Sequence, residues 1–156
     1  MRIPFKITLL IAALSVACTS TFMQSARDEG KPVKLELRLA EPEPQEGLTE
    51  ALIPGGNKKI YLHEEVIIAN KDIVEARAVK DDTLGVFQIE VTFTEEGARR
   101  VEKITEENLG KYMAILFDGR IISAPLVQSK ISDKAVISGH FTEEEAERIA
   151  NGINSK

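Results

Sequence analysis

The sequence predicts an α+β domain in which a mixed, mostly antiparallel sheet carries two helices packed on one face. Three observations support this prediction. Residues 33–39 and 86–93 alternate between apolar and polar side chains, which is the pattern of half-buried strands. Asp118-Gly119 lies between two apolar runs, which is the sequence of a tight hairpin turn. Residues 142–153 join a capping sequence to apolar residues at helical spacing.

Length and composition limit what this domain can be. The chain has 156 residues, 43% hydrophobic, 29% charged and 5% aromatic, which suits one compact domain. Its formal net charge of −5 argues against nucleic acid as a partner, because phosphate binding needs a clustered positive surface. A single cysteine excludes a disulfide within the chain and a metal cage of thiolates.

The first residues of the chain have the features of a secretory signal peptide. In residues 1–17 a basic start is followed by a mostly apolar run and then by small residues. The chain's only cysteine, Cys18, stands at the cleavage point, which resembles a bacterial lipoprotein signal and predicts a lipid on Cys18. Ordinary cleavage after Ala17 fits the same pattern. Residues 18–32 are then a polar tether, and residues 33–156 form the domain.

Strand signals dominate the first half of this domain. The alternation predicts that the strand at 33–39 has one buried face, and proline and acidic residues at 41–47 end it. Residues 73–79 are compatible with either a strand or a helix. A turn is expected at 54–59, with short strands at 60–62 and 66–68 and a longer strand at 86–93.

The second half alternates between strands and helices. Thr94 and two following acids are typical of a helix start, and Gly110 is typical of a helix stop. The Asp118-Gly119 turn joins strands at 112–117 and 120–124, and Pro125 ends the second of them. A further strand at 135–138 precedes a helix capped by Thr142.

No motif in the chain points to catalysis, a metal or a cofactor. His63 and His140 lack further ligands at metal-binding spacing. Gly55-Gly56 is not followed by the Lys-Ser/Thr of a phosphate loop, and no serine stands in a Gly-x-Ser-x-Gly elbow. The sequence therefore predicts a non-catalytic domain with no catalytic residue, metal site or cofactor.

Residues 105–125 and 137–146 resemble the head subdomain of the first large periplasmic domain of SecD and SecDF, which are preprotein translocase subunits. The shared pattern is an Asn-x-Gly-Lys helix end, an Asp-Gly hairpin running into Ser-Ala-Pro, and Ile-Ser-Gly-x-Phe-Thr before a helix. The likeness covers about residues 60–153, and residues 33–59 match less clearly. The residues that carry it shape the fold: Gly110, Asp118, Gly119, Pro125, Gly139 and Thr142. Gly139 is expected to let the chain bend before the second helix.

The resemblance implies a non-catalytic, protein-binding domain of the bacterial periplasm or cell envelope that assists export or envelope protein handling. Its implied partners are unfolded preprotein or Sec translocon components. The signal sequence adds the membrane as a partner, through an N-terminal lipid if Cys18 is modified. Apolar residues continue past the hairpin, so an extended client could add to a sheet edge there, although at least half of them are expected in the core. This predicted surface is Ile121, Ile122, Pro125, Leu126 and Val127. The alternative is an envelope lipoprotein that binds or inhibits one specific folded partner and has no role in export.

Overall fold

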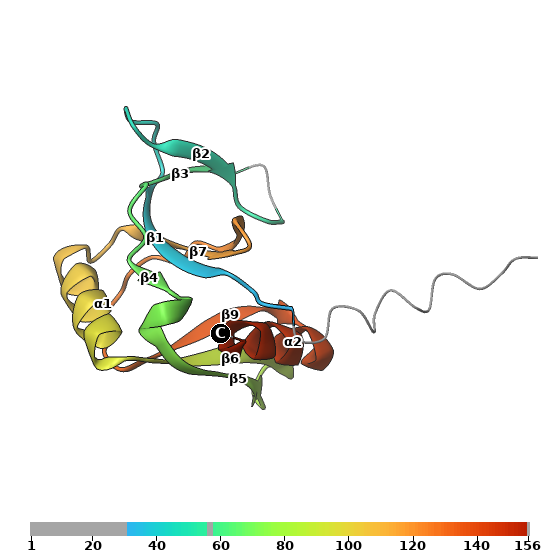
Figure 1. Ribbon diagram of the computed structural model, residues 1–156. Helices are drawn as coiled ribbons and strands as arrows, with labels where there is room; N and C mark the ends of the chain where they lie inside the picture. Colours follow the sequence, from blue (N-terminus) through green and yellow to red (C-terminus); the bar gives the residue numbers. More distant parts are fainter. Residues whose placement is uncertain (1–30, 56–57, 156) are drawn as a thin grey trace, which may run out of the picture.

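The computed structural model describes residues 31–55 and 58–155. Within them the chain forms two antiparallel sheets and two α-helices (Figure 1). The first sheet has the strand order β2-β3-β1-β7-β8, with β4 paired to β1, and the second has the order β5-β6-β9. The α+β class with mostly antiparallel strands is confirmed, and the strands divide over two sheets.

The first sheet consists of β1 (Leu35–Glu41), β2 (Thr49–Leu52), β3 (Lys59–Leu62), β4 (Ile68–Ala69), β7 (Tyr112–Phe117) and β8 (Arg120–Ser123). The second sheet consists of β5 (Ile73–Asp81), β6 (Val86–Phe93) and β9 (Lys134–Phe141). The helices are α1 (Glu95–Glu107) and α2 (Glu143–Asn154), and a short 3-10 helix, η2 (Asn70–Asp72), precedes β5.

One large core joins the two sheets and both helices. Ile89 and Ile137 point from the second sheet into this core, and Leu37 points into it from the first. Helix α2 packs mainly on β5, and Ile153 is one of its buried residues (Figure 1). Val101 of α1 is buried in the same core. The helices and the first sheet therefore share the apolar face of the second sheet.

The first sheet buries side chains on both of its faces, whereas the sequence predicted one buried face for its first strand. Ala40, Leu116 and Ile121 form a second, smaller cluster on the face that points away from the large core. Figure 1 shows β2, β3, β1 and β7 curving around this side. Glu36 is buried on the same face of β1, and Lys34 and Arg38 neutralise its charge. The alternating pattern misled because ion pairing allows this carboxylate to be buried.

The predicted turn and cap are present. Asp118 and Gly119 have φ angles of 49° and 77°, and the Asp118 carboxylate accepts a hydrogen bond of 2.9 Å from the Lys34 amide. The Thr142 hydroxyl accepts from the Glu145 amide at 3.2 Å, and the Glu145 carboxylate accepts from the Thr142 amide at 2.9 Å. These contacts fix the ends of β7 and α2.

Other segments differ from the sequence expectations. Residues 73–79 lie in a strand, because β5 pairs with β6 along its length. The short strand expected at 66–68 comprises only Ile68–Ala69, and β2 had no clear sequence signal. Gly139 lies inside β9, where a Cβ atom would be 2.5 Å from the ring of Phe141. Gly139 is thus favoured by close packing at a register shift.

Candidate functional site

Three connected pockets follow the border between the two sheets, and we call them together the inter-sheet groove. Their volumes are about 250, 470 and 750 Å³. The first and second pockets share Pro125 and Val136, and the second and third share Ile122 and Ser138. The groove therefore runs from the segment after β8 to the far end of β9.

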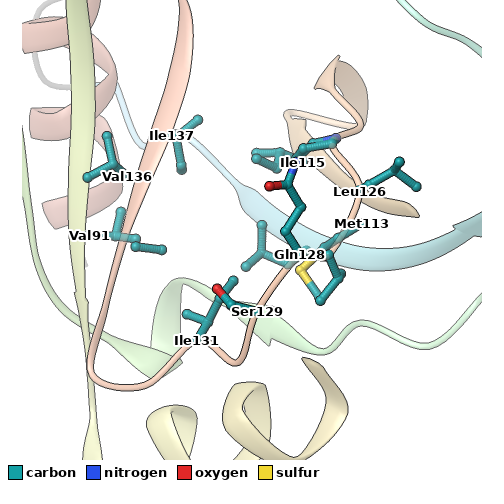
Figure 2. A pocket seen from close by; sticks show the side chains of 13 residues that line it. Val91, Met113, Ile115, Leu126, Gln128, Ser129, Ile131, Val136 and Ile137 are labelled. Carbon is teal, nitrogen blue, oxygen red and sulfur yellow. The ribbon is translucent and has the colours of Figure 1, made fainter. Parts of the chain in front are cut away.

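The first pocket has walls from both sheets. Figure 2 shows Val136 and Ile137 of β9 on one side, with Met113, Ile115 and Leu126 on the other. Ser129 and Ile131 close the end where the chain returns to β9.

Residues 125–131, which follow β8, form the outer wall of the groove, and backbone hydrogen bonds hold this wall against β7. The Met113 amide donates to the Pro125 carbonyl at 2.9 Å, and the Val127 amide donates to the Lys111 carbonyl at 2.8 Å. The wall is also tied to α1, because the buried hydroxyl of Thr105 accepts from the Ile131 amide at 3.0 Å. These bonds give the apolar wall a fixed position although it lies outside a regular strand.

The groove is apolar and uncharged. Among the described residues that line its three pockets, none is Asp, Glu, Lys or Arg, although 29% of the chain is charged. Leu126 is 45% exposed and Val136 is 50% exposed, so apolar side chains reach solvent on both rims. Such a surface is suited to apolar partners, because charged groups placed there would lose hydration without gaining a counter-charge.

The predicted binding surface is divided between the groove and the two cores. Pro125 and Leu126 are exposed and line the groove, and Ile122 is half-buried at its middle. Val127 lies at the bottom of the first pocket and is only 6% exposed. Ile121 is 7% exposed and belongs to the smaller cluster. The accessible part of this surface therefore consists of three residues.

The opposite wall was missing from the sequence prediction. Val136 and Ser138 come from β9, and only the pairing of β9 with β6 and the packing of the two sheets bring them to the groove. In sequence, Val136 is one apolar residue and Ser138 one small polar residue of a predicted strand, and both are common on protein surfaces.

The two histidines lie apart from each other, and neither belongs to a metal-binding group among the described residues. His63 Nε2 lies 3.4 Å from a carboxylate oxygen of Glu41, and His140 is exposed at the end of the groove. No group of three or more His, Cys, Asp and Glu side chains in residues 31–55 and 58–155 is placed to hold a metal ion. Over the same residues, no helix has the length and hydropathy needed to cross a membrane. The predicted signal peptide and Cys18 lie outside the described residues.

Comparison with known proteins identifies the family to which this fold belongs. The family model described as SecDF, P1 head subdomain, matches residues 46–155. The chain belongs to the SecDF P1 head family. The match includes β2 and β3, so the family likeness extends into the segment that resembled it less clearly in sequence.

Similar proteins are described as protein translocase subunits. The SecDF subunit of Thermus thermophilus is 42% identical over 90 residues, which cover 57% of this chain and 12% of that protein. The SecD subunit of Elusimicrobium minutum is 37% identical over 90 residues, covering 58% of this chain and 19% of that protein. This P1 head chain thus spans less than a fifth of the length of either relative.

Solved SecDF structures share the fold of this P1 head. A crystal structure of SecDF in a super-membrane-facing form superposes with a TM-score of 0.66 and 32% identity, covering 81% of this chain and 19% of that chain. A second, described as a membrane component SecDF that enhances protein export, gives a TM-score of 0.64 and 30% identity, covering 81% and 64%.

Proposed function

We propose that this domain binds segments of exported polypeptides that have not yet folded, and that it does so without catalysis in the periplasm or cell envelope. The observation that carries the proposal is the uncharged inter-sheet groove on a domain of the SecDF P1 head family. Unfolded chains expose the apolar side chains that such a groove accepts. Because relatives of this family are translocase subunits, the proposed partners are preproteins and Sec translocon components.

Photo-crosslinking in cells tests this function directly. A photoreactive residue is placed at position 126 on the rim of the groove, and crosslinked proteins are identified by mass spectrometry. We expect many exported proteins in non-native form, together with translocase subunits. A probe at position 109 is the matched control, because Leu109 is 56% exposed and lines none of the three pockets.

A charge placed on the rim should remove this binding. With the probe moved to position 136, Leu126→Asp is expected to reduce crosslinking to unfolded polypeptide by about tenfold, because the carboxylate must lose water in an apolar site. Leu109→Asp should leave the yield unchanged. Equal yields from the two variants would contradict the assignment of the groove.

The alternative function gives a different result in the same experiment. An envelope lipoprotein that binds or inhibits one folded partner would crosslink to a single protein in a fixed ratio, with no translocon subunit. That outcome would overturn the proposed role in export.

We further propose that a lipid on Cys18 holds the domain at a membrane surface. Two acyl chains or more anchor a protein far more firmly than one. Cells grown with an alkyne-labelled fatty acid should yield labelled protein, and Cys18→Ser should remove the label and release the domain from the membrane fraction. Unlabelled wild-type protein with an N-terminus at Cys18 would instead indicate ordinary signal cleavage after Ala17.

A further inference from the structure

Strand β9 has a free edge that borders the inter-sheet groove. Among the described strands, β9 pairs with β6 alone. Six consecutive residues, 135–140, line the groove, and they include residues from both faces of the strand. A pocket on one face of a sheet would be lined by every second residue. The groove therefore runs along the main chain at the edge of β9.

The backbone groups that face this edge can be assigned from the register. The Phe93 amide donates to the Asp133 carbonyl at 2.9 Å, so residue 133 directs its backbone toward β6. In an antiparallel ladder this direction alternates, which turns the amide and carbonyl of Val136 and Ser138 away from β6. These groups are directed toward the groove and form a ladder for one more strand.

The opposite edge of the same sheet is capped at Ala76. On β5, the Ala76 amide donates to the side-chain oxygen of Asn154 at 2.8 Å, and the Asn154 side-chain amide donates to the Ala76 carbonyl at 2.8 Å. At this residue a side chain of helix α2 takes the place of a further strand. Proteins commonly protect open edges with charges, proline or a covering element. In β9, Lys134 at the first position is a charged residue, whereas the bordering residues 135–140 contain no Asp, Glu, Lys, Arg or proline.

We infer that the β9 edge binds an extended, uncharged segment of polypeptide by adding it as a fourth strand to the second sheet. This inference rests on the proposed function and specifies which segments are bound and how. The bordering length of six residues corresponds to about 20 Å of extended chain. Recognition through the main chain accepts many sequences. The described lining contains no Asp, Glu, Lys or Arg, which favours segments without charge.

The occupant is therefore the kind of segment that later becomes a buried strand in its own folded protein. Its side chains alternate, and those on one side contact Leu126 and Met113 across the first pocket. A segment that carries Asp, Glu, Lys or Arg at its centre is disfavoured, because the described lining holds no Asp, Glu, Lys or Arg to pair with its charge.

Peptide binding to the full chain tests this inference. The probe is a fluorescein-labelled peptide with three Thr-Val repeats between Gly-Ser ends, and its dissociation constant is measured by fluorescence polarisation. N-methylation of either all the valines or all the threonines removes the amides on one edge of the bound strand. We expect at least one of these two peptides to bind at least about tenfold more weakly, because the hydrogen bonds donated by that edge of the strand are lost. Replacing the two central residues by Asp should weaken binding by a similar factor.

The protein side of the ladder is tested at Val136. Val136→Pro removes an amide that β6 does not use, whereas Val136→Thr keeps the amide and a similar shape. We expect weak binding for the proline variant and unchanged binding for the threonine variant. In the wild-type chain, the bound peptide should slow hydrogen exchange at the Val136 and Ser138 amides, which tests the edge even where the proline variant fails to fold.

The outcomes separate this inference from the proposed function. Peptide binding that tolerates both N-methylated series and leaves the Val136 and Ser138 amides unprotected would overturn strand addition, while the proposed function would stand. Failure of every uncharged peptide to bind, together with no crosslinks to unfolded chains, would overturn both. Tight binding of the Asp-containing peptide would contradict the proposed selectivity.

Discussion

At the scale of single residues, Glu36 is a buried carboxylate whose charge is paired with two cations. Its side chain is only 3% exposed, and it contacts Lys34 and Arg38, the latter at 2.7 Å. Burial by itself raises the pKa of Glu36, but the Lys34 ammonium and the Arg38 guanidinium outweigh burial and lower the pKa below its usual value. The ionised carboxylate is therefore the form that the folded state favours.

This pKa gives a prediction for the variant Glu36→Gln. The amide cannot replace both charged contacts, so the free energy of unfolding at pH 7 should fall by about 1–3 kcal/mol. A lowered pKa stabilises the fold above the unfolded-state pKa of about 4.3, and this contribution is lost as the pH falls through the folded-state pKa. Urea unfolding from pH 7 to pH 3 should therefore show the difference from wild type shrinking below about pH 4.

Glu50→Gln is the matched control, because Glu50 is 51% exposed and pairs with the exposed Lys59. Its effect on stability should stay below about 0.5 kcal/mol at every pH. If the loss caused by Glu36→Gln were equally large at pH 3, the ionised carboxylate would not be its source.

At the scale of elements, the start of the domain is fastened to the last helix at Gly152. The Val33 amide donates to the Gly152 carbonyl at 3.0 Å, which leads the chain into β1. A Cβ atom at Gly152 would lie 2.4 Å from a methyl carbon of Val33 and 2.8 Å from the Lys31 carbonyl oxygen. Helix α2 thus needs a glycine in its last turn, where the chain passes directly over it.

This contact reverses the usual effect of replacing a helical glycine. Helix propensity alone predicts that Gly152→Ala stabilises the protein by about 1 kcal/mol. We expect the variant to destabilise it by about 1–3 kcal/mol, because the backbone of residues 31–33 must move. The melting temperature of Gly152→Ala is compared with that of Asn151→Ala, a control substitution at the exposed neighbouring position on α2. A melting temperature for Gly152→Ala above that of the wild type would contradict this prediction, because it would show that residues 31–33 can move without a cost in stability.

Local sequence signals identified the elements that form from their own neighbours in the chain. The Asp118-Gly119 turn and the Thr142 cap depend on residues within three positions, so the sequence predicts them directly. Strand β2 has no such signal, because its pattern of mostly exposed side chains is that of an edge strand whose pairing with β3 defines it.

The candidate site could be predicted only in part for the same reason. Leu126 was identified because apolar residues follow the hairpin in sequence. Val136 was missed because it faces Leu126 only through the packing of two separate sheets. A site built between elements depends on contacts distant in sequence, whereas each of its walls has an ordinary local pattern.

At the scale of the whole molecule, two cores of unequal size predict two levels of stability. The large core joins both sheets and both helices, whereas the smaller cluster fastens β2 and β3 to β1, β7 and β8. The arm formed by β2 and β3 ends in an edge strand whose Leu52 is 61% exposed. We therefore expect this arm to open without global unfolding.

Native-state hydrogen exchange tests the independence of this arm with the variant Ile89→Val. Ile89 is fully buried in the large core, so the variant should lower the opening free energy of β6 amides by about 1 kcal/mol. Amides of β2 and β3 should keep their opening free energy, because an open arm leaves the contacts of Ile89 intact. Ile60→Val, in the smaller cluster, should lower the opening free energy of the β6 amides and that of the β2 and β3 amides. The reason is that this variant destabilises the native state, in which the arm is closed, and leaves the state with the open arm unaffected. Equal shifts in both regions for Ile89→Val would mean that the domain opens as one unit, and the groove would then have to receive its client beside a rigid arm.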